Sequence, residues 1–180
     1  MTIDDMLNEV AKITGTAPEK KTENNEKKSF PVTAASAHKA PAPLVSKSGL
    51  GLALAKELAY CVEQAAYAMG VNVVIAIVND GGRLVLMEAM DSSYIASIDA
   101  ARDKAYTAAA LRMPTHEALK EARGGALDGL TNGNGILLLG GGYPLIYNGA
   151  VIGGIGVSGG TKEQDMALAG AGVMYFEKRL

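Results

Sequence analysis

The sequence has few of the residues that most often carry chemistry. Its 180 residues include one cysteine, two histidines, two phenylalanines and no tryptophan. The single cysteine, Cys61, excludes an internal disulfide framework and is typical of a protein from a reducing compartment. Because Cys61 lies among apolar positions of a predicted helix, we expect a buried thiol and not a nucleophile. With so few aromatic side chains, the core must be built mainly from Ala, Val, Leu and Ile.

Other absences exclude classes of partner. The net charge of −2 provides no broad basic surface for the phosphates of a nucleic acid. No apolar run approaches the roughly 20 residues that span a bilayer. The first residues, "MTIDDMLNEVAKI", carry acids where a secretory signal would carry bases. We therefore expect a cytoplasmic protein that binds neither nucleic acid nor membrane.

The chain divides into three parts. Residues 1–13 have one apolar stripe at helical spacing, which predicts a short amphipathic helix that needs a partner to cover the stripe. Residues 14–47 are rich in Pro, Lys, Glu, Ser and Ala, which is the composition of a disordered linker. Residues 48–180 have the patterns of one folded domain. The stripe of the first part consists of Ile3, Met6, Leu7, Val10 and Ile13.

Within the domain, helical periods alternate with short β-branched runs joined by tight turns. "NDGG" predicts a hairpin turn after the first strand, and Asn148-Gly149 predicts another between the last two strands. Strands joined in this way form an antiparallel sheet, so we expect an α+β domain. The expected helices cover about 50–69, 94–112, 115–124 and 161–178, and the expected strands cover 71–78, 83–89, 136–139, 143–147 and 150–157.

The segment "GGGYPLIYNGAVIGGIGVSGGTKEQD" (140–165) is unusually rich in glycine. Glycines inside a strand leave a gap, which a flat ligand or a closely packed helix from a neighbouring subunit can fill, and close packing is the favoured interpretation. Thr161 and Gln164 form a predicted capping box at the start of the last helix. A phosphate site at this helix start is disfavoured because Glu163 and Asp165 would repel an anion.

Only a few side chains of the domain are candidates for holding a ligand. His116 lies in the first turn of the short helix and is a candidate metal ligand at a subunit boundary, although a solvated or hydrogen-bonded imidazole is favoured. Tyr106 belongs to a helix with a face of small residues, on which a porphyrin or another helix could lie; core packing is again favoured. That face consists of Ala101, Ala105, Ala108 and Ala109.

The charged residues of the same helix do not predict catalysis. Asp99 and Asp103 are four residues apart with Arg102 between them. Two carboxylates at this spacing could bind a metal or act in acid–base catalysis, but a solvated cluster of ion pairs is favoured. The sequence has no nucleophile, base and orienting residue in a recognisable arrangement and no cluster of His and Cys ligands. We therefore expect a binding protein more than an enzyme.

Three stretches together resemble the GlcG/HbpS-like family, which includes the C-terminal domain of PduO-type proteins. They are "AIVNDGGRLVLMEAMD" (76–91), "SIDAARDKAYTAAALRMPT" (97–115) and the glycine-rich segment 140–165. The resemblance covers about 48–180. It implies a profilin-like α+β fold with a five-stranded antiparallel sheet and a homo-oligomer.

The resemblance also implies a function. Several members of the family bind haem, and the PduO-type relatives are tied to bacterial microcompartments, where their other domain is a corrinoid adenosyltransferase. This sequence has no such domain, so we do not expect that activity here. The first helix also lacks the histidine thought to ligate haem in some relatives, and it offers Tyr60, Cys61, Tyr67 and Met69 instead.

We therefore predict a non-catalytic haem-binding protein inside a microcompartment in the cytoplasm. A corrinoid is the second candidate for the ligand. The N-terminal helix resembles an encapsulation peptide that docks on a shell or cargo protein, and the alternative is a frayed terminus or a helix that packs within the same chain. One alternative is an adaptor oligomer that links cargo to shell without a cofactor, and another is a corrinoid-processing enzyme. The candidate cofactor-binding residues are His116, Tyr106, Arg102, Gly140, Gly141, Gly142, Tyr143 and Thr161; we predict no catalytic and no metal-ligating residue.

Overall fold

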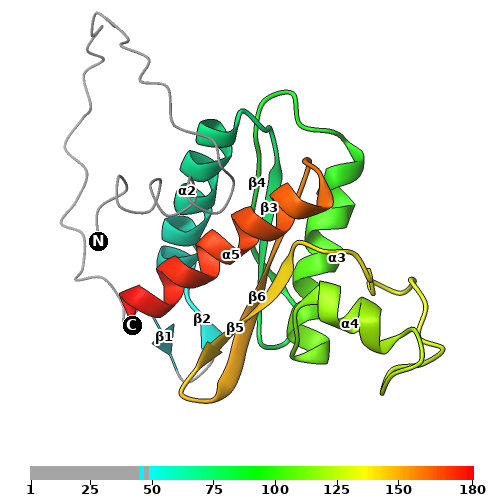
Figure 1. Cartoon of the computed structure of the whole chain (residues 1–180). Helices are drawn as coiled ribbons and strands as arrows, with labels where there is room; N and C mark the ends of the chain where they lie inside the picture. Colours follow the sequence, from blue (N-terminus) through cyan, green and yellow to red (C-terminus); the bar gives the residue numbers. More distant parts are fainter. Residues whose placement is uncertain (1–44, 47–48) are drawn as a thin grey trace, which may run out of the picture.

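The computed structural model describes residues 45–46 and 49–180 as an α+β domain with helices packed on an antiparallel sheet, as predicted (Figure 1). The stripe of residues 1–13 and nearly all of the predicted linker lie outside the described residues. The elements in chain order are β1 (Val45–Ser46), β2 (Gly49–Leu50), α2 (Leu52–Met69), β3 (Val74–Asn79), β4 (Leu84–Ala89), α3 (Ala96–Leu111), α4 (Thr115–Glu121), β5 (Gly142–Tyr147), β6 (Ala150–Ser158) and α5 (Lys162–Arg179).

The main sheet of the described domain has four strands in the order β4-β3-β6-β5, and not the five that were predicted. Every neighbouring pair is antiparallel. The expected strand at 136–139 is wrong because side chains take up its backbone N–H groups. The Leu137 N–H donates to Thr107 Oγ1 at 2.8 Å, and the Leu138 N–H donates to Asn132 Oδ1 at 2.8 Å. These local bonds replace a ladder to a neighbouring strand.

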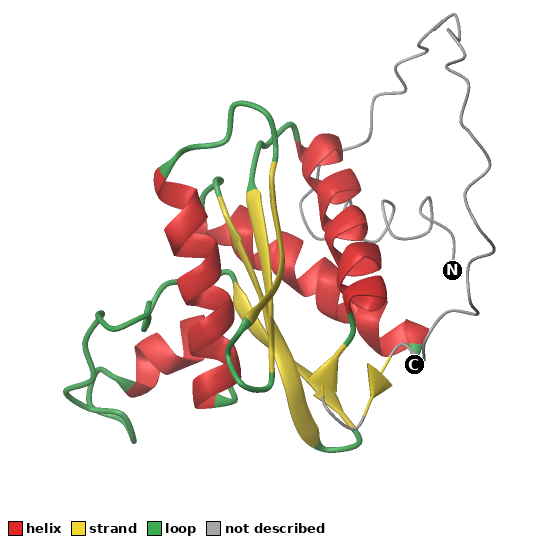
Figure 2. Ribbon diagram, turned by 180° about the vertical axis from the view of Figure 1, so that it is seen from behind, coloured by secondary structure: helices red, strands yellow, loops and turns green. Residues whose placement is uncertain are grey.

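The two faces of the sheet are covered differently. Helices α2 and α5 lie on one face, where a large core cluster joins their leucines and alanines to Ile75, Ile77 and Ile155. Helix α3 covers the opposite face, where a smaller cluster joins its alanines to Val74 and Ala76 (Figure 2). The continuous apolar run of β3 is explained by this arrangement, since both faces of the strand are buried.

Close contact between α3 and β6 explains the glycines inside the strand. A Cβ atom on Gly154 would overlap the carbonyl oxygen of Ala105, and one on Gly156 would overlap that of Ala101. The small-residue face of α3 and the glycines of β6 therefore fit each other. The gap is filled by a helix of the same chain, and not by a flat ligand or by a helix from a neighbouring subunit.

A buried ion pair connects the two helical layers. Lys104 of α3 is fully buried, and its Nζ donates to Asp165 Oδ2 at 2.7 Å and to the Val157 carbonyl oxygen at 2.9 Å. Burial lowers the pKa of Lys104 and raises that of Asp165, while the ion pair opposes both shifts. Removing one partner of such a pair typically costs about 3–5 kcal/mol, because the other charge is left buried and uncompensated. The pair therefore fixes the start of α5 against α3.

Local signals at the helix ends are confirmed. Thr161 caps α5 in a complete capping box with Gln164. Gly70 ends α2 in the left-handed conformation with φ of 66°. Cys61 is a buried thiol, as expected, and burial raises its pKa to about 12.

A pair of single-methyl substitutions tests the contact between α3 and β6. In Gly156→Ala the new methyl group would overlap the α3 backbone, so we expect a loss of about 1–3 kcal/mol or more in the free energy of unfolding. In the control Gly170→Ala the methyl group has nothing within 4 Å, so we expect a gain of about 0.5–1 kcal/mol from the better helix former. Urea unfolding followed by circular dichroism measures both, and equal midpoints for the two variants would contradict the packing.

Candidate functional site

One candidate site is a trough between the edge strand β5 and the outer face of α5. Its volume is about 460 Å³, which falls within the roughly 300–1,000 Å³ of small-molecule sites. We call it the α5 trough; its lining consists of Tyr143, Lys162, Glu163, Met166, Ala167, Gly170 and Met174. Apart from Lys162 and Glu163 at one end, the α5 side chains that line it are uncharged. The trough therefore suits a largely apolar ligand with an anionic or polar group at one end.

Sequence reasoning named Tyr143 but missed the part of the site that α5 contributes. The missed signal is a row with steps of four residues, Lys162, Met166, Gly170 and Met174. Side chains at this spacing share one face of a helix. The row is hard to recognise from sequence because two methionines and a glycine normally indicate core packing.

A smaller cavity of about 270 Å³ adjoins the trough, and Tyr143 lines both. Its walls come from the turn after α3, from β5 and from the C-terminal half of α5, with Phe176 and Val173 among them. Burial raises the pKa of Tyr143, and the nearby Glu117 carboxylate raises it further. The phenol therefore stays protonated at neutral pH in the free protein and can donate a hydrogen bond.

His116 lies beside Tyr143, with 5.8 Å between the two ring centroids, but lines neither cavity. Only 19% of its side chain is exposed, and its buried Nδ1 has no hydrogen-bond partner. Burial lowers its pKa, so the imidazole is neutral at pH 7; Glu117 opposes this shift, while Lys120 and Lys162 add to it. The sequence favoured an imidazole that is solvated or hydrogen-bonded, but Nδ1 of His116 is neither.

The predicted glycines pack closely around the start of β5, and one of them, Gly140, lies against the trough residue Met166. A Cβ on Gly140 would lie 2.8 Å from Met166 Sδ, so the absent side chain lets Met166 fold over the turn. Gly141 has φ of 110° and packs against Val157, while Gly142 packs against the backbone of Lys104. Close packing, the favoured interpretation of these glycines, accounts for all three.

Thr161 has a structural role at the start of α5. Its side chain accepts a hydrogen bond from the Gln164 N–H, and its own N–H donates to Gln164 Oε1 at 2.9 Å. The N–H of Gly160 donates to Asp165 Oδ1 at 2.9 Å. Because these N–H groups already have partners, the helix start has little left to offer an anion.

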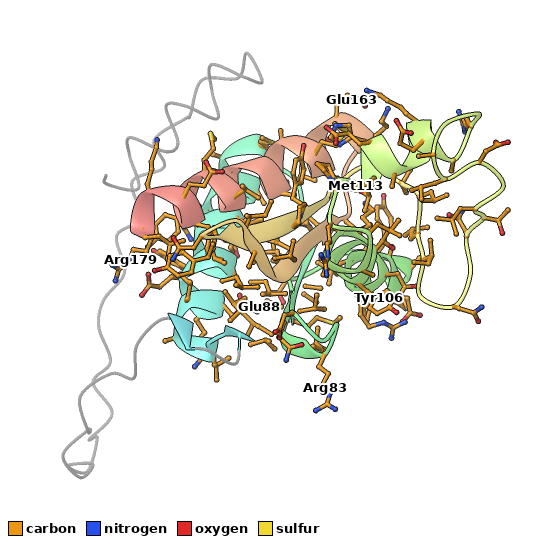
Figure 3. All side chains as sticks on the ribbon, turned by 90° about the horizontal axis from the view of Figure 1, so that it is seen from below. Arg83, Glu88, Tyr106, Met113, Glu163 and Arg179 are labelled. Carbon is orange, nitrogen blue, oxygen red and sulfur yellow. The ribbon has the colours of Figure 1, made fainter. Side chains whose placement is uncertain are left out.

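Tyr106 and Arg102 belong to α3 and lie on the opposite face of the sheet from the α5 trough; Figure 3 shows Tyr106 and the trough residue Glu163 on opposite sides. The Tyr106 ring packs between Gly82 and Gly135 of two different loops. Arg102 forms ion pairs of 3.1 Å with Asp99 and with Asp103, as the solvated cluster predicted.

Gly141, Gly142 and Thr161 have structural roles, and the other five predicted cofactor residues fall into two groups. His116, Tyr143 and Gly140 are at or beside the trough, whereas Tyr106 and Arg102 are remote from it. Within residues 45–46 and 49–180, no three His, Cys, Asp or Glu side chains converge to hold a metal ion. In the same part of the chain, no helix has the length and apolar character to cross a membrane.

The chain is similar in sequence and in structure to several known proteins. The chain is 49% identical over 121 residues to a 15.0 kDa protein from the dhaT-dhaS intergenic region of Citrobacter freundii, a match that spans 66% of this chain and 85% of that one. It is 39% identical over 102 residues to the corrinoid adenosyltransferase PduO of the same organism. That second match covers 55% of this chain but 30% of PduO.

A solved structure described as a PduOC:heme complex is similar over 70% of this chain and 94% of its own. The sequence identity is 33% and the TM-score is 0.66. A family model described as "haem degrading protein HbpS-like" matches residues 50–174. Because this match covers more than half of the sequence, the chain belongs to the HbpS-like family.

Proposed function

We propose that this protein binds haem in the α5 trough, with a corrinoid as the second candidate. The observation that carries the proposal is a trough of about 460 Å³ that is mostly apolar and has its charged groups, the Lys162 ammonium and the Glu163 carboxylate, at one end. A porphyrin has the same division, since its ring is apolar and its two carboxylates are anionic. The solved haem complex of a family member supports haem over a corrinoid.

The residues present fit such a ligand. Met166, Ala167, Gly170 and Met174 offer an apolar bed, and Lys162 offers a cation for a carboxylate. Haem iron takes His, Met, Tyr or Cys ligands. When bound, haem would supply iron chemistry that this chain's own side chains lack.

Two kinds of iron ligand lie at or beside the trough. The methionines offer thioethers, and His116 has an unpartnered Nδ1 next to Tyr143, whose protonated phenol can donate a hydrogen bond to a ligand. Cys61 does not fit, because it is buried and its pKa is raised to about 12, so the thiolate that binds iron is not formed at neutral pH.

The proposal extends to location. We propose that residues 1–13 direct the protein into a bacterial microcompartment by docking their apolar stripe on a shell or cargo protein. The stripe supports this, because an isolated helix of this length is marginal in water and is stabilised by a partner. If the protein binds no cofactor, a homo-oligomer of this chain would instead be an adaptor that links cargo to shell.

Haemin titration tests the ligand. We expect the wild-type protein to shift the Soret band in a saturable way, and Gly170→Leu to weaken binding at least tenfold. Gly170 is suited to this test because a Cβ atom there would have nothing within 4 Å, and the rest of the leucine side chain would occupy the trough. Thermal melting should show that Gly170→Leu remains folded.

The matched control is Ala53→Leu, which places the same leucine side chain at an exposed position of α2. It should bind haemin as the wild type does. Equal affinity of Gly170→Leu and the wild type would exclude the α5 trough, and the absence of any saturable shift would exclude haem.

Two charge substitutions in the N-terminal segment test the targeting proposal. Leu7→Asp places a carboxylate on the apolar stripe, whereas Asn8→Asp places one beside it. In this test, residues 1–47 are fused to a fluorescent protein. The wild-type and Asn8→Asp fusions should be present in purified compartments, whereas the Leu7→Asp fusion should be absent from them. Equal uptake of all three fusions would exclude the stripe as the targeting signal; uptake together with a failed haemin titration would favour the adaptor.

A further inference from the structure

We propose that the smaller cavity beside the α5 trough binds a free α-amino acid with a large apolar side chain, such as phenylalanine. In this site the apolar walls hold the side chain, and charged residues at the rim hold the ammonium and carboxylate groups. The proposal does not depend on haem binding.

The inner walls of the cavity are apolar. Phe176 of α5 and Pro144 of β5 both line the cavity, and both are buried. Val173 and Ile146 add aliphatic surface, and the Tyr143 ring adds a second aromatic wall, on which another ring can pack. The volume of about 270 Å³ is slightly below the roughly 300–1,000 Å³ of most small-molecule sites. The cavity therefore suits a molecule much smaller than a porphyrin.

Three charged side chains line the same cavity and form its rim. Arg112, Glu117 and Glu177 are all exposed, so their charged groups remain in contact with solvent. Among the described residues, the side chains of Arg112 and Glu177 have no hydrogen-bond or ion-pair partner. Glu117 lies 4.0 Å from Nε2 of His116, whose ring is neutral at pH 7. Groups of both signs are therefore available to a ligand at the rim.

The backbone conformation of Arg112 supports a role in binding. Arg112 ends α3 in the left-handed conformation, with φ of 56° and ψ of 33°, at a position where helices usually have glycine. Gly70 ends α2 with nearly the same angles, φ of 66° and ψ of 33°. The chain thus has an arginine where a glycine would favour folding more. Such strain is typical of a residue whose side chain serves a function other than folding.

The mixed charges of the rim determine the class of ligand. A ligand with only a carboxylate is attracted by Arg112 but repelled by the two glutamates, and a ligand with only an ammonium group is repelled by Arg112. An α-amino acid carries both groups on one carbon atom, so each group can lie next to a charge of opposite sign. The Tyr143 phenol, which stays protonated at neutral pH, is a further hydrogen-bond donor for the carboxylate.

Isothermal titration calorimetry of the full-length, haem-free protein tests the class of ligand with three probes that share one ring. L-Phenylalanine has both charges, 3-phenylpropanoate lacks the ammonium group, and L-phenylalaninamide lacks the carboxylate. We expect saturable binding of L-phenylalanine, at least tenfold tighter than binding of either other probe. The absence of saturable binding of L-phenylalanine, or equal affinity for all three probes, would overturn the proposal.

Two substitutions at the left-handed conformation test the position of the site. Arg112→Gly removes the guanidinium and supplies the residue that this conformation favours, so the melting temperature should rise while the affinity for L-phenylalanine falls at least tenfold. The matched control is Asn134→Gly, which also replaces a left-handed residue, with φ of 51°, but does not line the cavity. It should bind L-phenylalanine as the wild type does. Wild-type affinity in Arg112→Gly would overturn the proposal.

A substitution of the opposite charge keeps the proposal testable if Arg112→Gly changes the shape of the turn. Glu177→Gln removes one carboxylate from the rim and leaves the backbone unchanged. It should weaken the binding of L-phenylalanine and strengthen the binding of 3-phenylpropanoate, so that the preference between these two probes falls several-fold. An unchanged preference in Glu177→Gln would contradict the assignment of the rim.

Discussion

The contact between α3 and β6 determines how the rest of the domain is arranged. The backbone of α3 lies so close to β6 that Gly154 and Gly156 have no room for a methyl group. An approach this close requires alanine on the helix and glycine on the strand, and the sequence provides both. Because the contact is between two elements of one chain, this face of the sheet is closed to a flat ligand. The glycines in the most glycine-rich part of the sequence therefore allow a helix and a strand to pack closely.

Because α3 covers that face of the sheet, the candidate binding site lies on the opposite side. The ion pair between Lys104 and Asp165 extends from α3 to the first turn of α5, so the closed face holds in place the helix that forms the trough. Nearby, Gly140 makes room for Met166 at the trough floor. Packing and the candidate site are thus connected through a few side chains at the start of α5. Because α3 fills its own face of β6, the candidate site does not lie along the alanines of α3.

Much of the fold was predictable from the sequence because its signals are local. The α5 capping box, the Gly70 helix end and the hairpin at "NDGG" each depend on residues a few positions apart, and the structure confirms them. The strand predicted at 136–139 was wrong because Thr107, about thirty residues away, takes up one of its N–H groups. The sequence indicated only that Asp165 would repel an anion at the start of the last helix, since nothing nearby in sequence indicates that Lys104 is its partner. The trough was missed for the same reason, because β5 and α5 meet only in the folded chain.

The central claim is that a ligand binds on the α5 side of the sheet and not on the α3 side. Methyl ¹³C-labelled methionine spectra test this directly, because ferric haem broadens the signals of nearby methyl groups and each methionine can be assigned by substitution. The account predicts that haemin broadens the signals of Met166 and Met174, which line the trough, and spares that of Met87, which packs on the α3 side. Broadening of Met87 with sharp signals from Met166 and Met174 would contradict it.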